Sequence, residues 1–297
     1  MNDASGPPRP TDPARSFANV SDAYDRARPT YPLEAVAWMT GRLPSTVVEL
    51  GAGTGKLTDR LVELGHDVLA TDPLDEMLQH LRLRHPDLQV ATASAEAVPV
   101  ATRTVDTVVA AQAFHWFDTD KALAEAARML KTEGRIALCW NVRDERIPWV
   151  RRLGAIIGTN SGRDGNSSDM DPTDALVASR HFGYVETATF KHRQPLRRQD
   201  LRDLVLSRSN VAVLDPAGQQ RVLAEVDALF DEYDRGPDGL LLPYLTRCYR
   251  AVVRPRGLIE EPEHSADLTA AVNAVREARR GEHHPDDGPA TPLIDFR

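Results

Sequence analysis

Apolar positions along the chain follow two alternating patterns. Short, nearly continuous apolar runs, which are typical of buried strands, occupy residues 46–50, 67–71, 88–92, 104–112 and 135–141. The segments between them have helical spacing; Leu57, Leu61 and Leu64, for example, precede a glycine, Gly65, that is placed to end a helix. Strands that alternate with helices predict parallel strands joined by crossover helices. The pattern therefore predicts a doubly wound α/β sheet.

Weaker patterns after residue 141 extend this prediction. Two more apolar runs, at residues 185–191 and 246–253, would complete a seven-stranded, Rossmann-like sheet. Further helices are expected over residues 33–43, 147–157, 200–207 and 217–233, with a short helix before the Arg28-Pro29 step. The helices that lie outside the alternation predict lid insertions on the sheet domain.

Two helices have limits that single residues define. Asp72 and Pro73 are expected to open a helix with one apolar stripe, formed by Leu74, Met77, Leu78 and Leu81. Another helix carries an apolar face formed by Leu123, Ala127 and Leu130, and we expect it to stop at Gly134.

Composition divides the chain into a domain and two polar ends. Residues 1–15 predict a disordered tail, and residues 255–297 predict a partly disordered extension with one helix at 266–280. The domain is expected over residues 16–254, with an N-terminal helical cap and lid insertions at about 142–184 and 194–240. No internal repeat occurs.

Charge and cysteine content exclude several classes of function. The formal net charge of −8 argues against non-specific binding of nucleic acid, because a negatively charged protein repels the phosphates. No apolar stretch is long enough for a membrane helix, and the N-terminus has no hydrophobic signal core. Cys139 and Cys248 predict neither a zinc cluster nor a disulfide framework, and the His283-His284 pair has no partner ligands. We expect a cytoplasmic monomer or homodimer without a metal.

The sequence VVELGAGTGK at residues 47–56 is the strongest motif. A Walker loop is excluded, because only three residues separate Gly51 from Gly55 and no Ser or Thr follows Lys56. A dinucleotide loop needs G-x-G-x-x-G, whereas Gly51, Gly53 and Gly55 have the shorter G-x-G-x-G spacing. A dinucleotide site and a purely structural turn stay open as alternatives.

Four segments in order resemble those of the class I S-adenosylmethionine-dependent methyltransferases that act on small molecules. They are VELGAGTGKLT, ATDPLDEML, ASAEAVPVATRTVDTVVAAQAFHWFD and MLKTEGRIALCWNVRD, and AYDRARPTYP precedes them. The resemblance covers about residues 16–254. It implies the class I methyltransferase fold and S-adenosyl-L-methionine as cofactor.

The resemblance also implies cofactor-binding positions along the predicted strand ends. Glycines let the backbone lie against the cofactor, Asp72 would accept the ribose hydroxyls, and Glu49 would order the methionyl ammonium region. Ser94 stands where many members of the family have Asp. The implied cofactor residues are Tyr24, Arg28, Glu49, Gly51, Ala52, Gly53, Gly55, Asp72, Pro73, Met77, Ser94, Ala95, Glu96 and Gln112.

Several of these positions have a plainer structural alternative. Asp72 could cap the next helix, and Glu49 could be a solvated carboxylate facing a helix. Tyr24 and Arg28 could be solvated helix residues, and Met77 could pack in the core.

Fewer residues are candidates for binding the methyl acceptor or removing its proton. His115 can titrate near neutrality and could deprotonate a hydroxyl, although a histidine beside aromatic residues is often only part of a wall. Trp116 and Trp149 are candidates to line the substrate pocket together with His115. The sequence predicts methyl transfer to a small molecule, on a carboxylate or hydroxyl oxygen. A non-catalytic cofactor-binding regulator and, less favoured, an NAD(P)-dependent reductase stay open.

Overall fold

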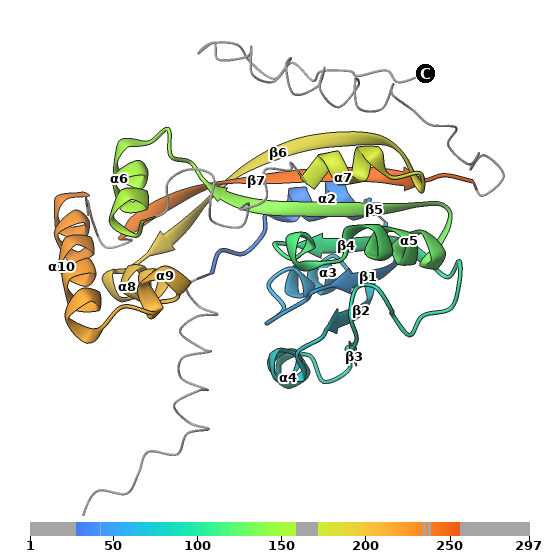
Figure 1. The fold of residues 1–297 in the computed structure, drawn as a ribbon, viewed down its shortest axis with the longest axis horizontal. Helices are drawn as coiled ribbons and strands as arrows, with labels where there is room; N and C mark the ends of the chain where they lie inside the picture. Colours follow the sequence, from blue (N-terminus) through green and yellow to red (C-terminus); the bar gives the residue numbers. More distant parts are fainter. Residues whose placement is uncertain (1–27, 42, 159–171, 234–235, 237–238, 256–297) are drawn as a thin grey trace, which may run out of the picture. The chain divides into compact units, whose positions relative to one another are not determined.

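The computed structural model describes residues 28–41, 43–158, 172–233, 236 and 239–255 (Figure 1). Contacts divide the chain into two compact units. Unit 1 consists of Met1–Pro32, Asn141–Asp164 and Lys191–Thr246, and unit 2 consists of Leu33–Trp140, Gly165–Phe190 and Arg247–Arg297. The predicted tail at 1–15, Tyr24, the first predicted helix and the extension after Pro255 lie outside the described residues.

A seven-stranded sheet with strand order β3-β2-β1-β4-β5-β7-β6 organises the fold. β1 pairs in parallel with β2 and β4, β2 with β3, and β4 with β5. Figure 1 shows β7 running opposite to its neighbours. The predicted doubly wound α/β sheet is confirmed. The strands are β1 (Thr46–Leu50), β2 (Asp67–Asp72), β3 (Gln89–Thr92), β4 (Val105–Ala111), β5 (Leu130–Arg143), β6 (Phe182–Leu196) and β7 (Leu240–Val253).

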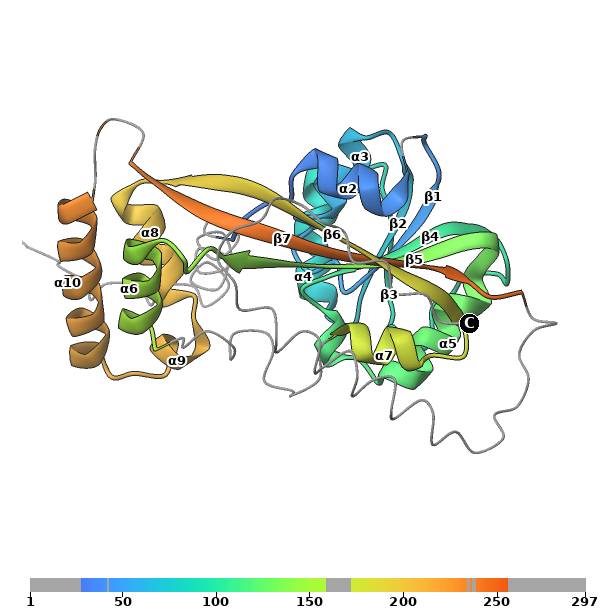
Figure 2. The same cartoon turned by 90° about the horizontal axis from the view of Figure 1, so that it is seen from above.

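Central strands are buried on both faces, which explains their continuous apolar sequences. Four of the five residues of β1 and five of the seven residues of β4 are buried. Helices cover both sides of this part of the sheet: Figure 2 shows α2 and α3 on one side and α5 and α7 on the other. The helices of unit 2 are α2 (Leu33–Thr40), α3 (Thr58–Glu63), α4 (Asp75–Arg84), α5 (Thr119–Met129) and α7 (Pro172–Ala178).

Two predictions about helices are wrong, the end of α5 and the apolar stripe of α4. α5 ends at Met129, and Leu130 begins β5 by pairing with Val105. Gly134 therefore lies inside a strand, where an added Cβ would come within 2.9 Å of the Lys131 carbonyl oxygen. The stripe predicted for α4 is also incomplete, because Leu78 and Leu81 are buried whereas Leu74 precedes the helix and is 57% exposed.

The predicted first lid insertion, residues 142–184, is divided between the two units. Its first part belongs to unit 1, but Gly165–Phe190 belongs to unit 2. The reason is α7, which the polar sequence around it did not predict. Leu176 of α7 is fully buried in the main core together with Leu123 of α5 and Phe182 of β6.

Unit 1 has a helical core of its own. Apolar side chains of its helices pack with Leu196, Leu240 and Leu242 at the ends of β6 and β7. The helices are α6 (Pro148–Ile156), α8 (Arg198–Leu206), α9 (Ser209–Ala212) and α10 (Pro216–Tyr233). None of the described helices is both long and apolar enough to cross a membrane.

Arg250 of β7 fixes α2 in unit 2. Its Nη1 donates to the Trp38 carbonyl oxygen at 2.6 Å, and its Nη2 donates to Glu186 of β6 at 2.6 Å. The guanidinium also lies 4.2 Å from the centre of the Trp38 ring. One side chain thus joins a helix and two strands.

Replacing Arg250 by Leu should therefore lower the free energy of unfolding of the protein by about 2–3 kcal/mol, since it removes charge-assisted hydrogen bonds and the cation–π contact. Arg247→Leu is the matched control, because Arg247 lies on the same strand but is exposed. Urea unfolding of both variants measures the difference. Equal losses in the two variants would contradict this role of Arg250.

Candidate functional site

The turn that follows β1 has a left-handed backbone at three glycines. The φ angles are 69° at Gly51, 55° at Gly53 and 92° at Gly55. Residues with a side chain rarely adopt such angles, so the alternation of glycines follows from the turn itself. The loop is held by the Ala52 N–H, which donates to the Thr71 carbonyl oxygen of β2 at 2.9 Å.

The three glycines differ in what surrounds them. A Cβ on Gly51 would lie 2.6 Å from the Ala113 Cβ, and a Cβ on Gly55 would lie 2.1 Å from Leu81 Cδ2 of α4. A Cβ on Gly53 would have no described atom within 4 Å. Gly51 and Gly55 are thus required by packing, whereas Gly53 leaves open space that a ligand can use.

Asp72 at the end of β2 is tied to this turn. One carboxylate oxygen accepts from the Gly53 N–H at 2.9 Å, and the other accepts from the Leu74 N–H at 2.9 Å. The helix-cap alternative does not hold, because α4 begins at Asp75 and its cap position, Leu74, has no side-chain capping bond. A buried carboxylate therefore lies beside the open space at Gly53.

Glu49 is buried beneath the turn rather than solvated. It is 1% exposed, and its Oε2 accepts from the Thr58 hydroxyl of α3 at 2.5 Å. Burial raises the pKa of the Glu49 carboxyl to about 8, with smaller contributions of the same sign from Asp59 and Asp72, while the bond from Thr58 opposes the rise. At neutral pH this carboxyl keeps its proton.

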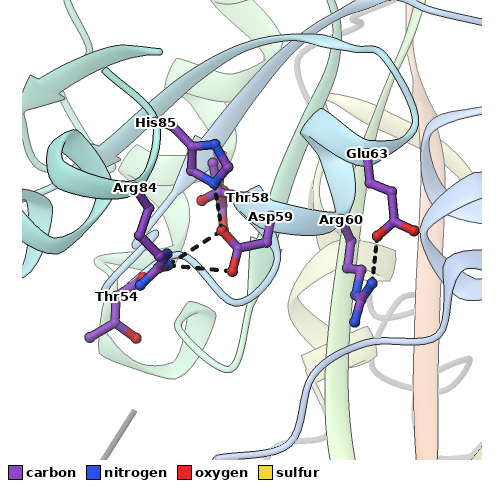
Figure 3. Close-up of polar contacts among 8 residues, drawn as sticks. Thr54, Thr58, Asp59, Arg60, Glu63, Arg84 and His85 are labelled. Atoms are coloured by element: carbon purple, nitrogen blue, oxygen red, sulfur yellow. Dashed lines mark hydrogen bonds and ion pairs between the residues drawn. The ribbon is translucent and has the colours of Figure 1, made fainter. Parts of the chain in front are cut away.

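Polar contacts between α3 and α4 support the turn from outside. Asp59 of α3 accepts from His85 at 2.7 Å and from Arg84 at 3.4 Å (Figure 3). Arg84 also donates to the Thr54 carbonyl oxygen within the turn. These bonds hold α4 against the turn. They keep Leu81 of α4 so close to Gly55 that a Cβ atom at position 55 would clash with it.

The loop after β3 forms a second part of this edge. Ala95 is buried, Ser94 is exposed, and the Ala97 N–H closes a turn by donating to the Ser94 carbonyl oxygen at 3.2 Å. The Glu96 carboxylate accepts from the Asp118 N–H at 2.9 Å, at the start of α5. This loop is therefore anchored to the segment after β4. Met77 is half-buried on α4, and Pro73 is exposed.

The segment after β4 carries strain and the candidate acceptor-side residues. Gln112 has a φ of 56°, which is unusual for a residue with a side chain and is typical of functional turns. The His115 and Trp116 rings lie 4.8 Å apart, and Trp116 is 79% exposed. Partial desolvation lowers the pKa of His115, which favours its neutral form although its side chain is exposed.

The turn, Asp72 and the segments after β3 and β4 all follow the carboxyl ends of neighbouring parallel strands, where ligands bind in such sheets. A model of a methyltransferase domain matches residues 48–138. A protein of Mycobacterium tuberculosis, described as an uncharacterized methyltransferase, is 42% identical over 245 residues, covering 82% of this chain and 97% of that protein. The chain belongs to the class I S-adenosylmethionine-dependent methyltransferases.

Other comparisons agree with this family. A methyltransferase-like protein of Schizosaccharomyces pombe is 33% identical over 245 residues, covering 80% of this chain and 94% of that protein. A solved structure from Anaeromyxobacter dehalogenans, provisionally described as a type II methyltransferase, shares the fold with a TM-score of 0.54 at 23% identity, covering 76% of this chain and 96% of that chain. Membership of the methyltransferase family sets the reductase alternative aside.

Two of the predicted site residues of the methyltransferase belong to unit 1, whereas this edge belongs to unit 2. Arg28 belongs to unit 1, and so does Trp149, which packs in the helical core with its ring 6.5 Å from that of Tyr233. Sequence reasoning assigned Leu74 to a core stripe, yet it is exposed and its N–H contacts Asp72. An exposed leucine two residues after the strand-end acid is a candidate contact for a ligand.

Two glycine variants separate the packing role from the ligand role. Gly53→Ala should cost only about 1–2 kcal/mol of unfolding free energy for the left-handed backbone, while Gly55→Ala should cost about 1–3 kcal/mol more because of the clash with Leu81. Calorimetry with S-adenosylhomocysteine should show at least about tenfold weaker binding for Gly53→Ala, since the new methyl occupies the open space. Unchanged affinity would remove Gly53 from the site.

Glu49 makes the stability of the ligand-free protein depend on pH. Its pKa is raised in the folded state from 4.5 to about 8, so the stabilisation is present at low pH and is lost as pH rises through this range. Relative to Glu49→Gln, the wild type should lose up to about 1.4 kcal/mol per pH unit. Urea unfolding of both proteins between about pH 5.5 and 7.5 measures this, and parallel profiles would contradict it.

Proposed function

We propose that this methyltransferase transfers the methyl group of S-adenosylmethionine to a small-molecule acceptor, with a carboxylate or hydroxyl oxygen favoured. The observation that carries the proposal is the open space at Gly53 beside the buried Asp72 carboxylate. A Cβ at residue 53 would project into that space, and a carboxylate in this position suits a pair of ribose hydroxyls.

The residues at this edge fit such a cofactor. Asp72 would accept from the ribose, the turn from Gly51 to Gly55 would lie against the methionyl part, and Ala95 with Glu96 would flank the base. Glu49 lies beneath the same turn and would favour a cationic group above it by giving up its proton. The bound cofactor supplies a methyl group already activated by a sulfonium, so the protein needs only to orient the acceptor and exclude water.

His115 is the candidate group for handling a proton. Its neutral form, favoured by its lowered pKa, can accept a proton from an acceptor hydroxyl. A carboxylate acceptor carries no proton to remove and would not need it. The effect of His115 on turnover therefore distinguishes the two kinds of oxygen.

A screen with labelled S-adenosylmethionine and a metabolite extract should yield a labelled product, whose mass identifies the acceptor. For a hydroxyl acceptor, His115→Ala should lower kcat about 100-fold or more, whereas for a carboxylate kcat should stay within about twofold. His80→Ala is the control, because His80 is a half-buried histidine of α4. Binding of S-adenosylhomocysteine without transfer to any acceptor would favour the non-catalytic regulator instead.

A further inference from the structure

A cleft of about 340 Å³ lies at the amino ends of β4 and β5, and all the residues that line it belong to unit 2. Leu130, which begins β5 and pairs with Val105 of β4, is one of them. Figure 1 shows that β7 ends on the side of the sheet where β5 begins, and its last residue, Val253, also lines the cleft. Because β4 is parallel to β1, the cleft and the glycine turn lie at opposite ends of these strands.

The lining of this cleft combines apolar and basic side chains. Leu130 and Val253 belong to its apolar part. Of the described residues that line it, none is acidic, although the formal net charge of the whole chain is −8. The cationic residues of the lining are Arg103, Arg128, Lys131 and Arg254. The cleft therefore gathers positive charge against the overall balance of the protein.

Two of these four cations are already paired. Arg128 Nε lies 2.7 Å from Glu125, and Lys131 Nζ lies 2.8 Å from Asp106. Both pairs leave little net charge behind, so they supply shape more than attraction. Any affinity of the cleft for an anion must come from Arg103 and Arg254.

Arg254 is fixed by one side of its guanidinium only. Its backbone N–H donates to the His181 carbonyl oxygen at 2.8 Å, and its Nε donates to the Phe182 carbonyl oxygen at 2.6 Å. Within the described residues, its two Nη groups have no partner. A guanidinium that is held in this way can offer its remaining N–H donors to two oxygen atoms of one phosphate or carboxylate.

Arg103 has an unusual backbone and an unpaired side chain. Its φ angle is 61°, and its N–H donates to the Arg128 carbonyl oxygen at 3.0 Å. Its side chain is exposed and makes no hydrogen bond or ion pair with the residues that the structure describes. Glycine adopts this backbone at no steric cost, and strained residues gather at functional sites. An arginine here is thus explained by what its guanidinium can bind, not by the turn.

We propose that this cleft is a second ligand site, separate from the cofactor edge, for a small molecule that carries a phosphate or carboxylate group on an apolar body. Arg103 and Arg254 would donate to the anionic group, and the apolar body would lie against Leu130 and Val253. The volume of the cleft falls within the range of small-molecule sites, about 300–1,000 Å³. The inference does not depend on the identity of the methyl acceptor.

Three probes of similar size test the chemistry. Phenyl phosphate, benzoate and the uncharged benzyl alcohol are titrated by calorimetry at low ionic strength, because salt screens exposed charges. At least one of the two anions should bind with a Kd of about 1 mM or tighter, and the tighter one identifies the anionic group that the site prefers. Benzyl alcohol should bind at least about tenfold more weakly. Binding of neither anion, or equal binding of the alcohol, would overturn the proposal.

Arg103→Gly is the decisive variant. It should weaken binding of the preferred anion about tenfold or more, while Tm stays unchanged or rises because glycine suits the left-handed backbone. Arg254→Met should weaken the anion as much, but its Tm is measured as well because it also loses the bond to Phe182. The matched control is Arg180→Met, which removes an exposed arginine that lies next to His181 but outside the lining. An unchanged Kd for Arg103→Gly would overturn the proposal.

Two further measurements test whether the site is separate and open to a ligand. With saturating S-adenosylhomocysteine, the Kd of the anion should change by less than about twofold, whereas competition would place the anion at the cofactor edge and overturn the inference. The chain continues beyond the cleft with Glu260, Glu261 and Glu263. If the anion bound only after all three were changed to Gln in the full chain, the cleft would serve the protein's own acidic segment, which also overturns the inference.

Discussion

The left-handed backbone of the turn after β1 is the constraint on which the candidate site depends. The chain passes so close to Ala113 at Gly51, and so close to Leu81 at Gly55, that a side chain on either glycine would clash. The end of β1, α4 and the segment after β4 can therefore converge on one point of the sheet. Asp72 then joins β2 to the turn through the Gly53 N–H, and the buried Glu49 lies beneath it.

Much of the fold could be predicted from the sequence, because strands buried on both faces produce continuous apolar runs. The limits of β1 and the parallel order of the first strands follow from this pattern. The pattern did not show that α5 ends at Met129, since Leu130 is apolar whether it ends a helix or begins a strand. α7 was missed because few apolar residues lie in the polar segment around it, and only the tertiary structure shows that Leu176 is buried.

The sequence predicted which residues form the candidate site better than it predicted what each of them does there. Spacing indicated that Gly51, Gly53, Gly55 and Asp72 belong together. It could not show which glycine is needed for packing and which faces a ligand, because that depends on the side chains of other elements, such as Leu81 of α4 at Gly55. The position of β7 between β5 and β6 was not predicted either, because no local sequence pattern reports the insertion of a late strand between two earlier ones.

The burial of the two cysteines limits what their thiols can react with. Cys139 and Cys248 are fully buried thiols, and burial raises the pKa of Cys139 far above its usual range, with Cys248 beside it as a further cause. A protonated thiol is a poor nucleophile. Because both thiols are buried, an electrophilic methyl donor in solution cannot reach them, and the same burial shields them from oxidants.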